Sequence, residues 1–193
     1  MTQSFELAPD EIVDAALAIF REQGLDAVSM RNVSARLDVS PVPLYNRVRN
    51  NAALLDAMAD RLLAGMAPPF DDRESWQAYA TRWAHAVRDR LRATPDIRLL
   101  LGDRRAPFVD ASRPLIDALR SSGFEADAAV QACRLLLWAV VGFAAVEARR
   151  PTRAPSSKRR RPGGDASGVT ASEADHLFDL LVGYLVDGLA RDL

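Results

Sequence analysis

The stretch LDVSPVPLYNRVRNN, residues 37–51, contains two prolines, Pro41 and Pro43, followed by a tyrosine and two arginines. Proline usually ends a helix, because it lacks a backbone N–H and its ring clashes with the carbonyl four residues earlier. Neither cost applies in the first turn of a helix, where the N–H groups have no partner within the helix. The stretch therefore predicts a short helix over residues 41–48, with Ser40 as its N-terminal cap.

The residues before this stretch also show helical spacing. Residues 9–23 carry one apolar stripe, with Pro9 in the first turn and Gly24 as the C-terminal cap. Ser29 is placed to cap a second short helix that runs to about Leu37. Two short helices joined by a tight turn and supported by a longer first helix form a helix-turn-helix unit.

The rest of the chain shows helical spacing with almost no alternation of the kind typical of strands. The fold class is therefore all-α, with about nine helices. A break at residues 67–72, rich in proline and aspartate, divides it into a domain over residues 1–67 and a second helical domain over residues 68–193. Residues 150–171, rich in Pro, Gly, Ser and Arg, predict a mobile loop. Further helices are predicted at about residues 50–67, 75–93, 125–149 and 172–190, with short helices between Pro95 and Ser121.

In a helix-turn-helix unit the second helix enters the major groove of DNA, and its N-terminal residues face the base edges. Val42 and Asn46 would lie on that face, where valine can contact a thymine methyl group and asparagine can bind adenine. Tyrosine, arginine and an exposed helix N-terminus are suited to phosphate groups. The predicted DNA-binding residues are Ser29, Arg31, Ser40, Pro41, Val42, Tyr45, Asn46, Arg47 and Arg49.

The distribution of charge supports this prediction. Residues 29–49 contain four arginines and one aspartate, a balance of 4 − 1 = +3. The remainder of residues 1–66 contains two arginines and eight acidic residues, a balance of 2 − 8 = −6, and the whole chain carries a formal net charge of −1. Basic residues are thus concentrated on the predicted DNA-facing helices. A small helical bundle with solvated arginines is the alternative interpretation.

Several classes of protein do not fit the composition. The single cysteine, Cys133, cannot form a disulfide within the chain, which is typical of a reducing compartment. The two histidines, His85 and His176, have no zinc-binding spacing, and the chain has no phosphate-binding loop or nucleophile elbow. We therefore expect no enzyme, no metal site and no cofactor. The longest apolar run, residues 135–146, is too short to span a bilayer, so we expect a cytoplasmic protein without a membrane partner.

Four motifs follow one another in register: A-A-L-x-I-F-x-E-x-G in the first helix, S-M-R-x-V-S-A-R-L-x-V-S up to the turn, P-L-Y-x-x-V-R-N, and L-L-D-A. Together they give residues 10–60 a specific resemblance to the DNA-binding domain of the TetR family of bacterial repressors. The resemblance implies a nucleoid-associated homodimer that binds operator DNA, and a ligand-binding and dimerisation domain over residues 68–193. Asp38 stands where the family usually has glycine, so we expect a left-handed backbone there. Asn51 replaces a usual lysine, which predicts a weaker grip on the DNA backbone.

The segments ESWQAYATRWAHAVRDRL, LLLGDRRAP and GFAAVEARR are most similar to the tetracycline repressor subclass. That subclass holds a drug–magnesium chelate with a histidine, and this chain has Leu100 at that position, so we expect a small hydrophobic ligand without a metal. Arg104 and Glu147 match the subclass by position. Plain core packing is the alternative for each aromatic residue of this region. The predicted ligand-binding residues are Met66, Trp83, Ala86, Leu100, Arg104, Phe108, Leu137, Trp138 and Val141.

Residues 135–146 are apolar on all sides, so a helix there must be buried on all sides. A partner subunit on one side, with a pocket or core on the other, satisfies this requirement. We therefore predict a homodimer through the helices at about residues 125–149 and 172–190. The hypothesis is a repressor released from its operator by a small hydrophobic molecule; the alternative is a helical DNA-binding protein without a ligand. The Arg-rich tract at residues 149–161 is either a solvated loop or an additional DNA- or membrane-binding arm.

Overall fold

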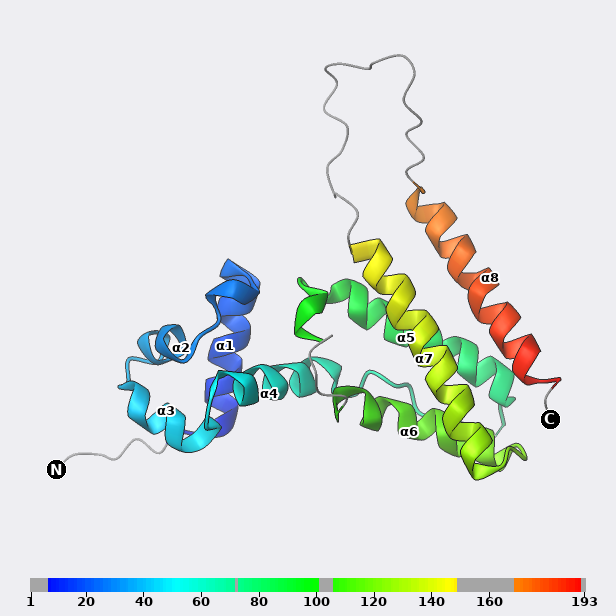
Figure 1. Cartoon of the computed structure of the whole chain (residues 1–193), viewed down its shortest axis with the longest axis horizontal. Helices are drawn as coiled ribbons and strands as arrows, with labels where there is room; N and C mark the ends of the chain where they lie inside the picture. The colour runs from blue at the N-terminus through cyan, green and yellow to red at the C-terminus, as the bar shows by residue number, and fades with distance from the viewer. Residues whose placement is uncertain (1–6, 72, 101–105, 149–168, 192–193) are drawn as a thin grey trace, which may run out of the picture. The chain divides into compact units, whose positions relative to one another are not determined.

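The computed structural model describes residues 7–71, 73–100, 106–148 and 169–191. In this part of the chain every regular element is helical, with eight α-helices and two short 3-10 helices (Figure 1). The prediction of an all-α protein is confirmed. The helices are α1 Pro9–Gln23, η1 Leu25–Ala27, α2 Met30–Arg36, α3 Pro41–Val48, α4 Asn51–Leu63, α5 Trp76–Ala93, η2 Ile97–Leu99, α6 Ala106–Ser121, α7 Ala126–Ala148 and α8 Ala171–Leu189.

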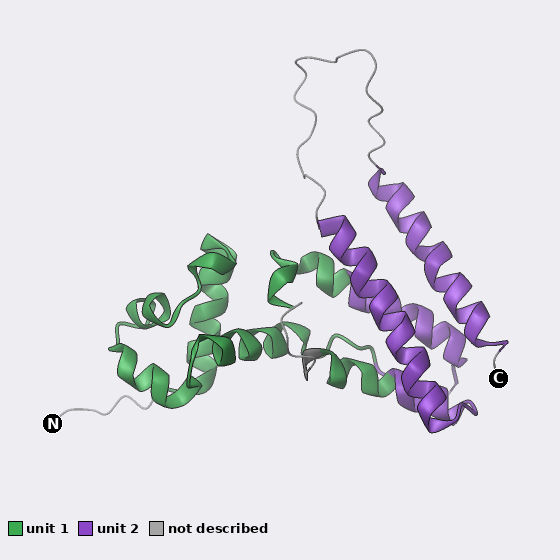
Figure 2. Ribbon diagram, viewed as in Figure 1, with its two compact units in different colours: residues 1–68, 89–114 green, residues 69–88, 115–193 purple. Residues whose placement is uncertain are grey.

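The chain divides into two compact units (Figure 2). Unit 1 comprises residues 1–68 and 89–114, and unit 2 comprises residues 69–88 and 115–193. The unit boundaries fall inside α5 and α6, so each of these helices contributes to both units. The division into functional domains at residues 67 and 68 stays a prediction. The predicted mobile loop, residues 150–171, and the Arg-rich tract lie outside the described residues, except for the segment that leads into α8.

Helix α1 supplies the centre of the core of unit 1. Its apolar stripe of Ile12, Ala16, Ile19 and Phe20 is buried, with no side chain more than 2% exposed. The helix begins and ends where the sequence predicted. Gly24 ends it at φ 87°, and the Gly24 N–H donates to the carbonyl of Phe20 over 3.0 Å.

The turn between α2 and α3 has the predicted backbone. Ser29 caps α2 by accepting a hydrogen bond from the Asn32 N–H at 3.2 Å. Asp38 adopts a left-handed conformation at φ 54°, which confirms that it takes the place of glycine. Helix α3 begins at Pro41, as its two prolines predicted. The expected side-chain cap of Ser40 is wrong, because Pro43 occupies the third helical position and has no N–H to donate; among the described residues the Ser40 side chain makes no capping bond.

Two other predicted boundaries were wrong. Helix α4 ends at Leu63 rather than near Ala67: the backbone leaves the helical conformation at Ala64, at ψ 130°, and Gly65 follows at φ 65°. The short helices expected between Pro95 and Ser121 are the 3-10 turn η2 and a single helix, α6, of 16 residues. Proline does not break α6 at its start, since Pro107 lies in the first turn, where no N–H bond is lost. These differences account for eight α-helices instead of about nine.

Helix α7 is buried on one side and exposed on the other in the single chain, which leaves a face for the partner subunit that the sequence predicted. Leu135, Trp138 and Val146 are 49%, 65% and 63% exposed and recur at helical spacing on one face. The helix is also long and apolar enough to cross a membrane by composition alone, with a mean hydropathy of 1.8, which the twelve-residue run did not suggest. However, it packs against α8 and buries an opposite face, as core helices that pass this test also do. The buried residues of α7 are Ala129, Ala132, Cys133, Leu136, Val140 and Ala144.

A buried arginine joins three helices of unit 2. The Arg88 side chain on α5 is 3% exposed, and its Nε and Nη2 atoms donate to the Glu147 carboxylate on α7 at 3.0 and 2.7 Å. Its Nη2 also lies 2.9 Å from the Asp175 carboxylate on α8. The guanidinium carbon is 4.4 Å from the ring centroid of Phe178 and 5.1 Å from that of Phe143. We call Arg88, Glu147 and Asp175 the arginine clasp.

The clasp keeps its arginine charged. Burial acts to lower the pKa of Arg88, but the hydrogen bond to Glu147 and the charges of Glu147 and Asp175 raise this pKa above the usual arginine value on balance. Near the same face, His85 Nε2 lies 3.2 Å from the Asp179 carboxylate, and its ring packs edge-on against Phe178. Helix α5 is thus tied to the last turn of α7 and to the first two turns of α8.

Arg88→Ala should lower the free energy of unfolding by about 3–5 kcal/mol, because Glu147 would stay buried without its partner. Urea denaturation followed by circular dichroism, at a fixed protein concentration, measures this loss. Arg82→Ala is the matched control: Arg82 also pairs with a carboxylate, that of Glu74, but is 43% exposed, so its loss should cost about 1 kcal/mol or less. Equal losses in the two variants would show that the arginine clasp contributes no more than a surface pair.

Candidate nucleic-acid interface

Helix α3 buries two of its side chains in the core of unit 1. Leu44 and Val48, four residues apart, are 0% and 9% exposed and face the core. The other six residues of this eight-residue helix are exposed, with Val42 at 66% and Tyr45 at 51%. A helix anchored along one narrow stripe presents most of its circumference to solvent. This is the geometry that the second helix of a helix-turn-helix needs to enter a groove.

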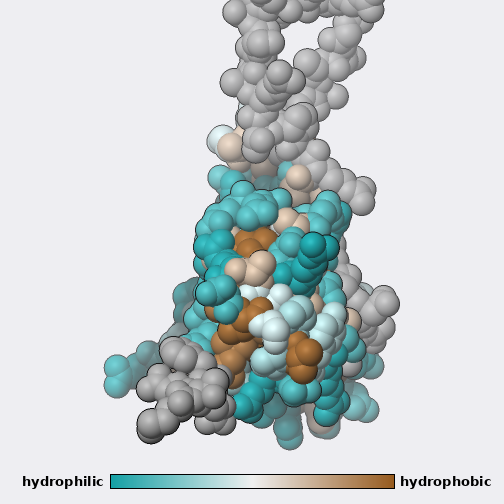
Figure 3. Space-filling view, turned by 90° about the vertical axis from the view of Figure 1, so that its left-hand side faces the viewer, coloured by the Kyte–Doolittle hydropathy of each residue, from teal (hydrophilic) through white to brown (hydrophobic). Residues whose placement is uncertain are grey.

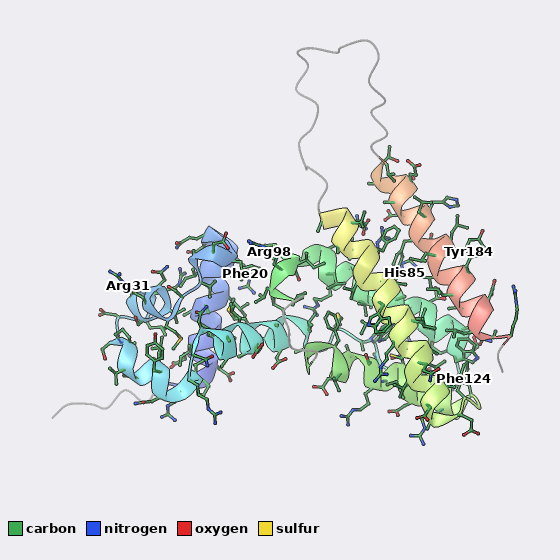
Figure 4. All side chains as sticks on the ribbon, viewed as in Figure 1. Phe20, Arg31, His85, Arg98, Phe124 and Tyr184 are labelled. Atoms are coloured by element: carbon green, nitrogen blue, oxygen red, sulfur yellow. The ribbon has the colours of Figure 1, made fainter. Side chains whose placement is uncertain are left out.

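The structure brings the predicted DNA-binding residues together in unit 1, on the N-terminus of α2, on α3 and beside it. Arg31 projects outward from α2 (Figure 4). Arg49 ends α3 with a left-handed backbone at φ 62°, and its N–H donates to the carbonyl of Tyr45 at 3.0 Å. Ser29 is half-buried, because its hydroxyl caps α2. The DNA contacts of these residues stay a prediction. The exposed members are Arg31, Ser40, Pro41, Val42, Tyr45, Asn46, Arg47 and Arg49.

One of the arginines in the basic stretch serves the fold instead. The guanidinium of Arg36 on α2 donates to both carboxylate oxygens of Glu22 on α1, at 2.7 and 2.8 Å. The hydrogen bond from Arg36 lowers the pKa of Glu22. Arg36 lies at the opposite end of α2 from Ser29, and its charge is neutralised locally. Removing it from the balance of residues 29–49 leaves three arginines and one aspartate, 3 − 1 = +2.

A second polar network in unit 1 involves a residue that the sequence did not single out. Asp96 caps η2 by accepting from the Arg98 N–H at 2.9 Å, and it also holds the Arg98 guanidinium at 2.6 Å. That hydrogen bond from the Arg98 side chain lowers the pKa of Asp96. The same guanidinium lies 3.4 Å from Asp26 in η1, directly after α1. Residues 96–98 are thereby tied to the helix-turn-helix part of unit 1, and only the Asp-x-Arg spacing hinted at this.

The predicted ligand-binding residues do not all lie in one unit. Met66, Leu100 and Phe108 belong to unit 1, where Met66 and Leu100 are 5% and 2% exposed. Trp138 lies on the exposed face of α7, away from the core of unit 2. Arg104 is outside the described residues. Their role in ligand binding stays a prediction. The other members, all in unit 2, are the fully buried Trp83 and the half-buried Ala86, Leu137 and Val141.

The aromatic residues of α5 fit plain packing equally well. Trp76 is 5% exposed and packs edge-on against Phe124, with ring centroids 5.1 Å apart. Tyr79 is fully buried and packs edge-on against Phe70 at 5.0 Å, and burial raises the pKa of Tyr79 to about 12. Glu147, matched to the tetracycline repressor subclass by position, belongs to the arginine clasp. Among the residues that the structure describes, no group of His, Cys, Asp and Glu side chains is placed to hold a metal ion.

Comparison with known proteins decides the family. The family model described as bacterial regulatory proteins, tetR family, matches residues 12–58, from α1 into α4. Over 202 aligned residues the chain is 30% identical to the class A tetracycline repressor from transposon 1721 of Escherichia coli. That alignment covers 96% of this chain and 92% of the relative. The chain belongs to the TetR family. The resemblance inferred from the motifs is thereby confirmed.

Solved structures of this family have the same fold. A TetR variant from Acinetobacter baumannii AYE in complex with minocycline is 27% identical, with a TM-score of 0.74 and coverage of 96% of this chain and 97% of that one. The fold of BioQ bound to its double-stranded DNA operator matches with a TM-score of 0.70 at 23% identity, over 95% of this chain and 98% of that one. As a TetR family member, the chain is a dimeric, ligand-responsive, DNA-binding transcriptional repressor.

Arg49→Ala should weaken binding to DNA and reduce the slope of log K against log salt by about 0.9, the loss of one phosphate contact. Arg36→Ala, on the neighbouring helix, should change this slope much less, because the Arg36 guanidinium is already bound by Glu22. Fluorescence anisotropy with a labelled operator duplex between about 50 and 200 mM salt measures both slopes. Thermal unfolding of each variant checks that the fold is kept. Equal changes in slope would contradict the separation of structural and DNA-facing arginines.

Proposed function

We propose that this repressor binds a palindromic operator with residues 40–47 in the major groove and is released by a small, largely apolar molecule bound within residues 68–193. The outward face of α3 carries the proposal, because Leu44 and Val48 anchor the helix while Val42, Tyr45 and Asn46 are exposed. Arg31, Ser40, Pro41, Arg47 and Arg49 are exposed around them and complete the proposed DNA-binding face, with Ser29 at the N-terminus of α2.

The proposed ligand binds without a metal ion. Leu100 stands where the tetracycline repressor subclass has its metal-binding histidine, and a leucine side chain has no lone pair to give to a metal. Leu100 is also 2% exposed, so it packs as an ordinary core residue of unit 1. Leu137 and Val141, half-buried on α7, would supply apolar contacts. The solved TetR relative was crystallised with minocycline, but the residues of this chain favour a ligand held by apolar contact.

The homodimer is proposed to form through α7 and α8. Each helix has one exposed apolar stripe: Leu135, Trp138 and Val146 on α7, and Leu177, Leu180 and Tyr184 on α8. Figure 4 shows Tyr184 on α8, and this residue is 72% exposed. Large apolar side chains exposed along one face of a helix are typical of a protein interface. A two-fold dimer would present two α3 helices to half-sites about 34–36 Å apart. We call these six residues the apolar stripe pair.

The proposal places the protein in the bacterial cytoplasm, on nucleoid DNA while ligand is absent, and gives it no catalytic role. Release of DNA requires that the ligand bind better to the conformation that does not fit the operator. Helix α4 leads along the chain from the helix-turn-helix towards residues 68–193, so it is the element through which we expect this preference to act.

A gel-shift titration of the intergenic DNA upstream of the gene tests the function. We expect a sequence-specific complex at moderate salt that apolar compounds dissociate, those compounds being found by a thermal-shift screen of hydrophobic drugs and metabolites. Dissociation should be the same with and without EDTA, because no metal takes part. The lack of any sequence-specific complex would refute the operator proposal. Specific binding that no thermally stabilising compound reverses would instead support a DNA-binding protein without a ligand.

Trp138→Glu should convert the dimer to a monomer and reduce operator affinity at least tenfold, because a carboxylate buried in an apolar interface has no partner to compensate its desolvation. Sedimentation velocity measures the oligomeric state, and the gel shift measures the affinity. Val109→Glu is the matched control: Val109 is 55% exposed and lies on α6, outside the apolar stripe pair, so this variant should stay dimeric. A dimeric Trp138→Glu variant would place the interface elsewhere.

A further inference from the structure

The first turn of α3 is unusually poor in hydrogen-bond donors. Its first three residues are Pro41, Val42 and Pro43, and only Val42 has a backbone N–H. The preceding Ser40 is at the cap position, but its hydroxyl makes no capping bond within the described chain. The end of the helix that faces the bases therefore offers three apolar side chains and one backbone donor. These three residues can therefore contact a base edge mainly through apolar groups.

The apolar side chains of this turn are exposed. Val42 is 66% exposed, and the neighbouring prolines are exposed as well. Burial of an exposed valine against another apolar group is favourable, and no residue of unit 1 provides such a group for most of this side chain. In the major groove, thymine presents the only apolar group on a base edge, its 5-methyl group. The chemistry of the turn thus matches thymine and no other base.

Charge and shape argue for DNA rather than for an apolar protein partner. Figure 3 shows the side that carries α2 and α3, where hydrophobic patches are small and hydrophilic side chains surround them. Arg31, Arg47 and Arg49 are exposed near the apolar turn, and α3 contains no acidic residue. A protein interface requires a much larger apolar area. DNA, a polyanion whose thymine bases carry isolated methyl groups, fits this surface better.

We propose that Val42, framed by Pro41 and Pro43, recognises the 5-methyl group of a thymine in each operator half-site. This proposal rests on the proposed function, in which α3 enters the major groove. Asn46 lies four residues further along the same face of α3 and reads its base through hydrogen bonds. The axial separation of the two residues is about 6 Å. The methyl-dependent position and the position read by Asn46 therefore lie within about two base pairs of each other.

The test uses operator duplexes that the full-length protein selects from a random DNA library. Each thymine of the selected site is replaced in turn by deoxyuridine, which lacks only the 5-methyl group. For the unchanged protein we expect one or two positions per half-site at which the replacement weakens binding about fourfold, the equivalent of about 0.8 kcal/mol per methyl group. Deoxyuridine outside the half-sites should have no effect.

Two variants test whether Val42 causes the loss of affinity on replacement of thymine by deoxyuridine. Val42→Ala should bind thymine and deoxyuridine duplexes equally at the sensitive position, while Asn46→Ala should keep the methyl effect and lose base preference at a neighbouring pair. Thermal unfolding confirms the fold of each variant, and Val42 is too exposed for its truncation to disturb the core. A half-site insensitive to deoxyuridine, or an unchanged methyl effect in Val42→Ala, would overturn the proposal. If no duplex is selected at all, the proposed DNA-binding function fails instead.

Discussion

The position of α3 depends on where its backbone is allowed to become helical. Pro41 and Pro43 are compatible with a helix only in its first turn, and Asp38 provides the left-handed residue that lets the chain leave α2 and reach Pro41. With the start fixed, the helical period places Leu44 and Val48 on the core and everything else outside. A shift of one residue would rotate the helix by about 100° and bury a different set. The surface that we propose faces DNA is thus set by the conformation of the backbone.

The two prolines that fix the start of α3 also limit the hydrogen bonds that its first turn can donate. They remove two N–H donors from the turn that we propose faces the bases, and Pro43 removes one of the two N–H groups that the Ser40 side chain could have capped. Helix α3 therefore begins with three apolar side chains and reaches its first hydrogen-bonding side chains at Tyr45 and Asn46. The start of α3 and the proposed mode of base recognition therefore have the same cause, the two missing N–H groups.

Several arginines of this chain hold carboxylates within the fold, both in the interior and at the surface. Arg88 is buried with two carboxylates and two phenyl rings around it, where its charge keeps α5, α7 and α8 in one arrangement. Arg36 and Arg98 are more exposed but are held in fork geometry by Glu22 and Asp96. These pairs orient the segments that they join but add little to the free energy of unfolding, since exposed ion pairs contribute little. The arginines left to the proposed DNA-binding face are correspondingly fewer than a count of the sequence suggests.

The sequence by itself determined the all-α class, the helix-turn-helix, the start of α3 and the left-handed turn at Asp38. These features depend on the proline ring, on backbone sterics and on apolar spacing, all of which act between residues close in the chain. The tertiary structure alone decided that Arg36 pairs with Glu22, that Arg88 closes a clasp with Glu147, and that α7 exposes Trp138. Helical spacing shows that α7 is apolar on every side, but which side faces α8 depends on residues far away in sequence. Helical periodicity carries no information about residues distant in the sequence. The ion-pair partner of each arginine and the buried face of α7 are therefore known only from the packed helices.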